Sequence, residues 1–263
     1  MIALITDFGL ADPYTGQMKG AILAGAPEAV IVDITHMVEP YNVAQAGFFL
    51  AASLGSFPRG TVFVAVVDPG VGGTRRIVGV RKRGRILLAP DNGLLGLALR
   101  GPGAVEAFDL TPDSNAAASA TFHGRDVFAP LAALLDCGED LACLGLGIDP
   151  GTLVAASASE AKNTGNSWSA HVLHLDRFGN CVLDIPADAR LPMPGKALLT
   201  KPVSVAIELA PNYESLDYGR IGLICSSQGF YELAVNQGSA AEVLGLELGD
   251  EIELSLTGES ARA

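Results

Sequence analysis

The sequence has few basic residues and no long apolar run, and these absences disfavour several classes of protein. Only 17 of its 263 residues are lysine or arginine, against 29 acidic ones, and the net charge of −12 disfavours a nucleic-acid or anionic membrane surface. The longest apolar candidate, around Gly47–Leu54, is too short for a membrane span and has helical spacing. Met1 leads directly into the strand-like segment Ile2–Thr6 with no basic region, which disfavours a signal peptide. We therefore predict a cytoplasmic protein with no nucleic-acid or membrane partner.

Cysteine is also scarce, and the four cysteines lack the spacing of a metal site. Cys137 and Cys143 are separated by five residues, and Cys181 and Cys225 stand far from them and from each other. Metal ligation is therefore not expected. Buried thiols in a reducing compartment are the better interpretation.

Apolar residues are abundant, at 49% of the sequence against 17% charged residues, which excludes disorder. In the first half, apolar runs typical of buried strands alternate with helically spaced segments. The expected strands are Ile2–Thr6, Ala29–Ile34, Thr61–Val67, Ile77–Val80 and Arg85–Ala89, and the expected helices are Tyr14–Gly25, a segment capped by Asn42 that ends at Ser53, and Asp126–Leu135. This alternation predicts an α/β domain over residues 1–160, with a parallel or mixed sheet that is covered on both faces.

The pattern changes near residue 155. The segment Ala155–Ser169 is rich in alanine, serine, asparagine and threonine and is interpreted as a connector. Short β-patterned runs separated by turn residues follow it, at Ala170–Leu175, Val203–Leu209, Arg220–Cys225, Phe230–Val235 and Glu251–Leu256. They predict a second, all-β domain over residues 169–263, either a barrel or a sandwich.

The loop between Asp68 and Arg76 is the first candidate site. Asp68 follows the predicted strand Thr61–Val67, and a proline and three glycines separate it from Arg75. A carboxylate at the carboxyl end of a buried strand, followed by an arginine, indicates a charged site at the edge of a sheet. A salt bridge that pins the loop is the alternative. The glycine spacing matches neither the P-loop nor the dinucleotide-binding pattern, so phosphate binding is not expected.

Three other segments carry residues suited to binding or catalysis. Asp7 ends the first strand, where a carboxylate can accept bonds from ribose hydroxyls or cap a helix. His123 precedes a helix and is either a proton relay or a structural residue. In the turn Asp176–Asn180, Asp176 can hold an ammonium and Asn180 can bond an adenine edge, although a simple β-turn explains the segment equally well.

Together these segments resemble one family. The motifs occur in the order Ile5–Gly9, Asp33–His36, Val67–Gly73 with Arg75, Ala89–Gly93, Thr121–Asp126 and Phe178–Asn180. In this order they resemble the S-adenosylmethionine (SAM) hydrolases, also called SAM hydroxide adenosyltransferases, which are related to the SAM-dependent fluorinase and chlorinase. The resemblance implies an N-terminal α/β domain with a mostly parallel sheet, a C-terminal β-barrel, and a homotrimer with active sites at subunit interfaces.

The resemblance also assigns roles to individual residues. Asp68, Arg75 and His123 match the residues that position and activate water. Asp7, Tyr41 and Phe122 match the residues that surround the ribose, with Asp7 on its hydroxyls. In the second domain the matched substrate-binding residues are Asp176 for the methionine ammonium, Asn180 for adenine, Phe178 as a further substrate-binding residue, Tyr213 as a weaker candidate for stacking on adenine, and Ser227 near the amino-acid end.

The sequence departs from the halogenases at positions that matter. Asp68 stands where they have a tyrosine, and Gly124 where they have a serine of the halide pocket. A carboxylate repels a halide, so Asp68 favours water as the nucleophile. Gln228 stands where they have an arginine for the substrate carboxylate, and Asp184 replaces an asparagine that is common after the Phe-Gly-Asn motif.

The predicted reaction is hydrolysis of SAM to adenosine and L-methionine by attack of water on the ribose C5′. The leaving group is a neutral thioether and needs no protonation, and neither a metal nor an organic cofactor is expected. A SAM-dependent halogenase and a non-catalytic SAM- or adenosine-binding protein are the alternatives.

Overall fold

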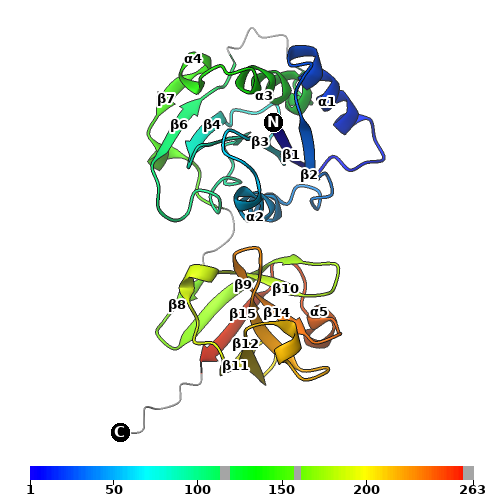
Figure 1. Ribbon diagram of the computed structural model, residues 1–263, viewed down its shortest axis with the longest axis vertical. Coiled ribbons are helices and arrows are strands. Elements are labelled where there is room, and N and C mark those ends of the chain that lie inside the picture. The colour runs from blue at the N-terminus through cyan, green and yellow to red at the C-terminus, as the bar shows by residue number, and fades with distance from the viewer. Residues whose placement is uncertain (113–118, 157–160, 257–263) are drawn as a thin grey trace. The chain divides into compact units, whose positions relative to one another are not determined.

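The computed structural model describes residues 1–112, 119–156 and 161–256 and divides into two compact units, Met1–Ser157 and Ala158–Ala263 (Figure 1). Part of the predicted connector, residues 157–160, lies outside the described residues. The rest of that segment is not all connector, because β8 (Lys162–Asn163) and the beginning of β9 (Ser167–Leu175) lie in it.

Unit 1 is built on a sheet of seven strands. In spatial order they are β2 (Ile31–Thr35), β1 (Ile2–Thr6), β3 (Val62–Val66), β5 (Arg85–Pro90), β4 (Ile77–Lys82), β6 (Val105–Asp109) and β7 (Leu146–Ile148). The strands from β2 to β5 are parallel to one another, and β4, β6 and β7 extend the sheet with antiparallel pairings. The predicted α/β class is confirmed.

Helices cover both faces of this sheet (Figure 1). Helices α1 (Tyr14–Gly25) and α3 (Ala129–Asp136) lie over one face, and α2 (Val43–Ser53) lies over the other. Because alternate side chains of a strand point to opposite faces, β1 contributes to two cores: Ile2 and Leu4 belong to one, and Ala3 and Ile5 to the other. A π-helical turn η2 (Gly124–Phe128) precedes α3, and the remaining short turns are η1 (Leu54–Ser56), α4 (Leu141–Leu144) and η3 (Pro150–Thr152).

Several predicted elements have the expected bounds. Strand β1 and helix α1 agree with the predicted residues at both ends. The side chain of Asn42 caps α2 by accepting a hydrogen bond of 2.9 Å from the backbone N–H of Gln45. The prediction that Ala29–Ile34 forms a buried strand was wrong in its burial, since β2 is an edge strand that is only partly covered and exposes Asp33.

The prediction that the cysteine thiols are buried was wrong for three of the four. Cys137, Cys143 and Cys225 are exposed, and only Cys181 is buried. Each exposed cysteine stands at or near the end of an element, where local spacing does not determine burial. Burial raises the pKa of the Cys181 thiol to about 12, so this thiol stays protonated at neutral pH.

Unit 2 is a closed barrel of seven strands. Around the ring they are β10 (Cys181–Pro186), β14 (Phe230–Val235), β13 (Ile221–Cys225), β12 (Val205–Ala210), β11 (Gly195–Lys201), β15 (Glu251–Leu256) and β9, which pairs with β10 and closes the ring. The two-residue β8 extends the edge of β9. The short turns of this unit are η4 (Ala187–Ala189), η5 (Tyr213–Ser215) and helix α5 (Ala240–Leu244). The structure therefore selects a barrel over a sandwich.

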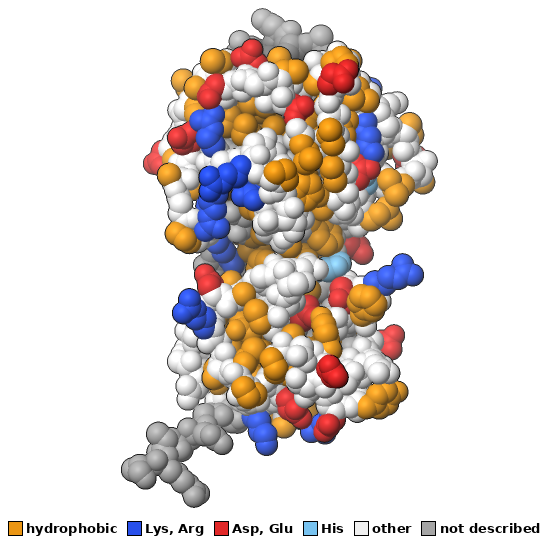
Figure 2. All heavy atoms as spheres, viewed as in Figure 1, with side chains coloured by type: hydrophobic (Ala, Val, Ile, Leu, Met, Phe, Trp, Pro, Cys, Tyr) orange, Lys and Arg blue, Asp and Glu red, His pale blue; other side chains and the backbone are white. Residues whose placement is uncertain are grey.

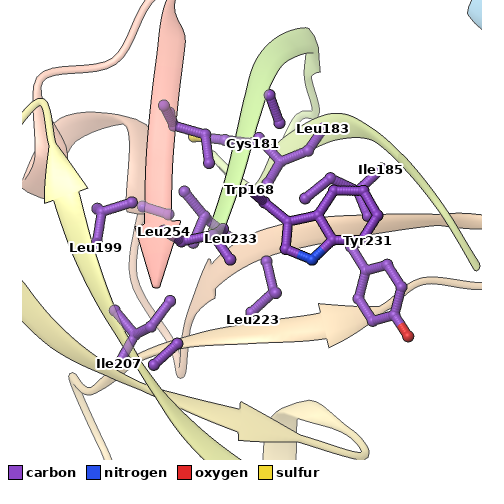
Figure 3. Packing of buried hydrophobic residues seen from close by; sticks show 14 of the residues in the cluster. Trp168, Cys181, Leu183, Ile185, Leu199, Ile207, Leu223, Tyr231, Leu233 and Leu254 are labelled. Carbon is purple, nitrogen blue, oxygen red and sulfur yellow. The ribbon is translucent and has the colours of Figure 1, made fainter. Parts of the chain in front are cut away.

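The barrel interior is filled by apolar side chains from all sides of the ring (Figure 3). Trp168 of β9 and Leu233 of β14 lie inside it, with neighbours from β10, β13 and β15. Tyr231 packs its ring in the core, and its hydroxyl oxygen accepts a 2.9 Å hydrogen bond from the backbone N–H of Leu191. The hydroxyl of this buried tyrosine thus has a hydrogen-bond partner.

Acidic, basic and apolar side chains are interspersed on the face of both units that Figure 2 presents. No helix within the described part of the chain is long and apolar enough to cross a membrane.

Candidate active site

The sheet order of unit 1 brings several predicted site residues to one edge. Asp7 follows β1 and Asp68 lies two residues beyond β3, and these parallel strands are neighbours. Arg75 precedes β4, which runs antiparallel to β5. The start of an antiparallel strand lies at the same edge as the carboxyl ends of the parallel strands. The acid and the base therefore meet there, where ligands bind in open α/β sheets.

Asp68 and Arg75 form a buried ion pair. The Nε of Arg75 lies 3.1 and 3.0 Å from the two carboxylate oxygens of Asp68, and its Nη2 donates a further bond to Oδ2. The side chains are only 5% and 11% exposed, so solvent screens the pair far less than a surface salt bridge.

His123 joins this pair through its Nδ1, which lies 2.7 Å from Nη2 of Arg75. A guanidinium can only donate, so Nδ1 of His123 is the acceptor and the ring proton resides on Nε2. Burial lowers the pKa of His123, and the Arg75 charge lowers it further against the opposing effect of Asp68 and Asp126. The contacts therefore describe a neutral imidazole that can donate from Nε2.

Close backbone packing holds the Asp68–Arg76 loop in place. Gly72 has φ of +77°, and a Cβ added there would lie 2.3 Å from the carbonyl oxygen of Ala120. Only glycine lets this loop lie against the segment that leads to His123. The side chain of Asn92 donates a 2.9 Å bond to the carbonyl of Val67, which fixes the backbone just before Asp68.

Arg76 has a separate structural role. Its guanidinium bonds Asp91 at 2.8 and 2.6 Å and also donates to Thr152. The other oxygen of the Asp91 carboxylate accepts a 2.9 Å bond from the backbone N–H of Val154. Arg76 thus ties the end of the loop to Asp91, while the salt bridge that the sequence left open as an alternative is the Asp68–Arg75 pair itself, which the structure contains.

A pocket of about 590 Å³ lies at the same edge of unit 1 and includes three predicted ribose-binding residues, Asp7, Tyr41 and Phe122. Asp7 Oδ2 accepts a 2.9 Å bond from the backbone N–H of Tyr41, whose φ of +67° turns the chain at this point. The remaining residues that line the pocket are Phe8, Asp12, Tyr14, Gln17, Pro40, Ser119, Thr121 and Arg125. Asp68, Arg75 and His123 are not among them, although His123 directly follows Phe122 in the chain.

Sequence reasoning missed several residues of this pocket. The rings of Phe8, Tyr14 and Phe122 meet edge to face with centroids 5.3 to 6.2 Å apart, and the Arg125 guanidinium lies 5.0 Å from the Phe122 centroid. Helical spacing had assigned Tyr14 only to the start of α1. An exposed aromatic at the start of a helix, directly after a strand-end loop, was a signal available in the sequence.

The Gly124 position is closely enclosed by the same aromatic rings. A Cβ added there would lie 2.8 Å from Cζ of Phe8 and 3.3 Å from Cε2 of Phe122. A serine at position 124 therefore requires Phe8 to move, and Phe8 is held by its two ring contacts.

Unit 2 has its own cavity, of about 690 Å³, on the outside of the barrel wall. The five residues predicted for this unit all line it: Asp176, Phe178, Asn180, Tyr213 and Ser227. The other lining residues are Ser226, Gln228, Glu232, Val235, Asn236, Gln237 and Gly238.

The carboxylate of Asp176 organises the turn that carries Asn180. Oδ1 accepts bonds of 2.8 and 2.9 Å from the backbone N–H groups of Phe178 and Asn180, and Oδ2 accepts a 2.9 Å bond from the Asn180 side chain. The Asn180 amide is thereby oriented, with its nitrogen toward Asp176 and its oxygen left to accept from another group.

Glu232 was not predicted. It lines the cavity with its side chain buried, and the hydroxyl of Tyr213 donates a hydrogen bond to its Oε1. The signal in the sequence was a single acid inside the apolar run Phe230–Val235, which was interpreted only as a strand.

Comparison with known proteins identifies the family of the chain. The model of the SAM hydroxide adenosyltransferase N-terminal domain matches residues 2–145, and that of the C-terminal domain matches residues 170–253. The chain belongs to the SAM hydroxide adenosyltransferase family. It is 37% identical to the (R)-S-adenosyl-L-methionine hydrolase of Salinispora arenicola, with 97% of each chain covered. It is more distant from the fluorinase of Actinopolyspora mzabensis, at 27% identity with 97% of each chain covered.

A solved structure shares the fold of this family member over nearly its whole length. The crystal structure of an uncharacterized conserved protein from Thermotoga maritima superposes with a TM-score of 0.87 at 33% identity, covering 97% of this chain and 100% of that one. The family resemblance predicted from the motifs is thus confirmed. The individual roles of the site residues stay predictions.

Proposed function

We propose that the protein hydrolyses S-adenosyl-L-methionine to adenosine and L-methionine. Water or hydroxide attacks the ribose C5′ in line with the C5′–S bond, the new O–C5′ bond forms, and the C5′–S electron pair leaves with sulfur. The sulfonium becomes a neutral thioether, so the leaving group needs no proton. The observation that carries this proposal is the contact chain of Asp68, Arg75 and His123 at the carboxyl edge of the sheet.

This contact chain favours water over a halide. Water both donates and accepts hydrogen bonds. It can donate one to the Asp68 carboxylate and accept one from the Nε2–H of His123. A halide is an anion that can only accept hydrogen bonds, so the Asp68 carboxylate repels it. The enclosure of Gly124 by Phe8 supports the same choice, because the serine of a halide pocket would require Phe8 to move.

The proton of the attacking water goes to Asp68. The Nδ1 lone pair of His123 is already engaged with Arg75, and its Nε2 carries the ring proton, so the neutral imidazole has no basic nitrogen left. Arg75 then stabilises the developing hydroxide. His123 orients the water, and proximity supplies several kcal/mol of the barrier reduction.

The pockets of the two units supply the substrate contacts. In unit 1, Asp7 holds the ribose hydroxyls and Tyr41 and Phe122 pack beside the sugar. In unit 2, Asn180 reads the adenine edge, Phe178 and Tyr213 pack near the base, and Asp176 and Ser227 bind the methionine end. The support for these roles is that each group of residues lines one pocket.

We further propose a homotrimer in the cytoplasm, with each active site formed by unit 1 of one subunit and unit 2 of its neighbour. The support for this assembly is the resemblance of the sequence motifs, which implies a homotrimer with active sites at subunit interfaces.

One experiment tests the reaction directly. The purified protein is incubated with SAM in ¹⁸O-water, in chloride-free and in chloride buffer, and the products are analysed by mass spectrometry. Adenosine that carries ¹⁸O at the 5′ position is the expected product in both buffers. Formation of 5′-chloroadenosine would indicate a halogenase, and unchanged SAM that is nevertheless bound would indicate a non-catalytic protein.

A further inference from the structure

His36 ends the motif Asp33–His36, and the proposed reaction gives this residue no role. It directly follows β2, which is the parallel neighbour of β1, and so it stands beside the end of the strand that leads to Asp7. The side chain of His36 is only 1% exposed. A buried imidazole normally has partners for both of its nitrogens, and the partners of His36 therefore indicate what it does.

The two ring nitrogens of His36 face different residues. Nδ1 lies 2.8 Å from Oγ1 of Thr6, the last residue of β1. Nε2 lies 3.0 Å from Oδ1 of Asp33, in an electrostatic contact rather than an aligned hydrogen bond. A carboxylate attracts the ring proton, so we place the N–H at Nε2 and the lone pair at Nδ1. The hydroxyl of Thr6 is therefore the donor to His36.

Asp33 is an ionised partner for the ring. Its other oxygen accepts a 2.5 Å bond from Nζ of Lys19. Partial burial raises the pKa of Asp33, but the contacts with Lys19 and His36 outweigh this effect and lower the pKa below its ordinary value. The carboxylate is thus charged at neutral pH and fixes the orientation of the imidazole.

Thr6 transmits the orientation of His36 to the turn that carries Asp7. Its Oγ1 accepts a 3.2 Å bond from the backbone N–H of Phe8. Because the hydroxyl proton is directed to His36, the oxygen lone pairs are left to face this N–H. Thr6 precedes Asp7 and Phe8 follows it, so one hydroxyl fixes the chain on both sides of Asp7.

Backbone bonds hold the same segment independently of these side chains. The N–H of Gly9 donates a 2.8 Å bond to the carbonyl of His36, and the N–H of Val38 donates a 3.3 Å bond to the carbonyl of Thr6. Substitution of the His36 or Thr6 side chain leaves these bonds possible. Such a variant therefore retains the course of the chain and loses the fine placement of Asp7, whose carboxylate lines the ribose pocket.

We propose that His36 is a positioning residue that holds Asp7 for the ribose hydroxyls through Thr6, and thereby sets the preference of the enzyme for ribose. This assignment rests on the proposed function, in which Asp7 binds those hydroxyls. It deepens that function by naming what makes the carboxylate selective. A binding group is effective only when it is held to within about 0.5 Å of its productive place, and the contacts of His36 supply that support.

The test measures the binding of two nucleosides to the full-length enzyme by titration calorimetry. Adenosine has both ribose hydroxyls, and 2′,3′-dideoxyadenosine lacks them. The ratio of the two dissociation constants is the ribose preference. For the wild type we expect a preference of about 10- to 100-fold for adenosine, the range for a hydrogen bond to a charged group.

Two variants break the contact at different residues. In His36→Leu and in Thr6→Val we expect the ribose preference to fall at least about fivefold, because a displaced carboxylate loses part of that bond. The dissociation constant of dideoxyadenosine should stay within about threefold of the wild type, because this nucleoside makes no such bond. His36→Asn keeps an acceptor near the place of Nδ1 and should restore most of the preference. The ratio does not depend on the fraction of folded enzyme, so a less stable variant still gives an answer.

Two further variants separate this role from a general structural one. If His36 acts through Asp7, then adding His36→Leu to Asp7→Ala leaves the ratio of Asp7→Ala unchanged. Thr35→Val is the matched control. It removes a 3.0 Å bond to the backbone N–H of Met37 in the same turn, outside the contact of His36 with Thr6, and should keep the wild-type ratio.

The outcomes that overturn the proposal are specific. They are a wild-type ratio in His36→Leu or Thr6→Val, a fall in Thr35→Val as large as in His36→Leu, and equal binding of both nucleosides by the wild type. Hydrolysis of SAM is measured on the same preparations. Its absence in the wild type would refute the proposed function, and the nucleoside ratios would still decide the role of His36.

Discussion

Nη2 of Arg75 lies 2.7 Å from Nδ1 of His123, a residue 48 positions further along the chain. The guanidinium can only donate, so this contact assigns the acceptor role to Nδ1 and the proton to Nε2. In the proposed mechanism His123 is therefore a hydrogen-bond donor in a fixed position, and Asp68 is the base.

Replacement of His123 by glutamine tests this division. The glutamine amide can accept from Arg75 with its oxygen and donate with its nitrogen, so we expect turnover within about tenfold of the wild type, the value of a single neutral hydrogen bond. Asp68→Asn keeps the shape and loses the base, and we expect kcat to fall about 10²- to 10⁴-fold with KM for SAM little changed. Adenosine formation measured by chromatography gives both values. If His123→Gln were as inactive as Asp68→Asn, His123 would be the base.

The protonation of His123 gives a second prediction. Burial and the Arg75 charge lower its pKa from the ordinary 6.5, so His123 stays neutral as pH falls until below that value. Activity needs neutral His123, and the acidic limb of kcat therefore lies below pH 6.5. NMR titration of the histidine rings should find the pKa of His123 lowered in the wild type.

Charge variants give this prediction a definite sign. Arg75→Gln removes the cation that lowers the pKa of His123, so the pKa should rise. Asp68→Asn removes a carboxylate that raises it, so the pKa should fall. A shift in the same direction in both variants would contradict the electrostatic explanation.

The sequence predicted the scaffold well where a local pattern determines the structure. Phe230–Val235 and Glu251–Leu256 have the expected bounds, because continuous or alternating apolar residues have few other solutions. Strand β10 (Cys181–Pro186) was not among the expected strands, although it too is an apolar run that contains one acid. That acid, Asp184, is fully buried and accepts a 2.8 Å bond from the backbone N–H of His171.

The site was predictable only in part. The strand-end positions of Asp7 and Asp68 follow from the parallel sheet, which the apolar runs indicated. The contact between Arg75 and His123 joins two loops, and no spacing rule encodes it; only the family resemblance grouped His123 with Asp68 and Arg75. The burial of Glu232 depends on η5, which covers the outer face of the barrel, and one strand considered alone cannot reveal that.

The enclosure of Gly124 by Phe8 gives a third prediction. Gly124→Ser places a Cβ 2.8 Å from Cζ of Phe8, and we expect the free energy of unfolding to fall. Overpacking of this kind costs about 1–3 kcal/mol. Phe8→Leu shortens the obstructing side chain, so the double variant should be more stable than the sum of the single effects predicts. Urea unfolding of the four proteins measures this coupling.

Gly20→Ser is the matched control for this cycle. A Cβ at Gly20, on the exposed face of α1, meets no atom within 4 Å. Serine there removes a helix glycine and should leave stability unchanged or slightly increased. Additivity of Gly124→Ser and Phe8→Leu would mean that the Phe8 ring can move aside at no cost, and the steric argument against a halide pocket would fail.

The proposed sharing of active sites between subunits gives the last prediction. Asp68→Asn disables unit 1 and Asn180→Ala disables unit 2, and each variant alone should have little activity. When the two chains are co-expressed in equal amounts, a site is intact if its unit 1 comes from the Asn180→Ala chain and its unit 2 from the Asp68→Asn chain. Random assembly of a closed ring therefore restores about a quarter of the wild-type sites.

Adenosine formation by the mixed trimers, with the trimer established by light scattering, measures this fraction. Activity no greater than that of the two variants assembled separately would place both halves of each site within one subunit. Because the chains are mixed during synthesis, slow exchange between finished trimers cannot produce that negative result.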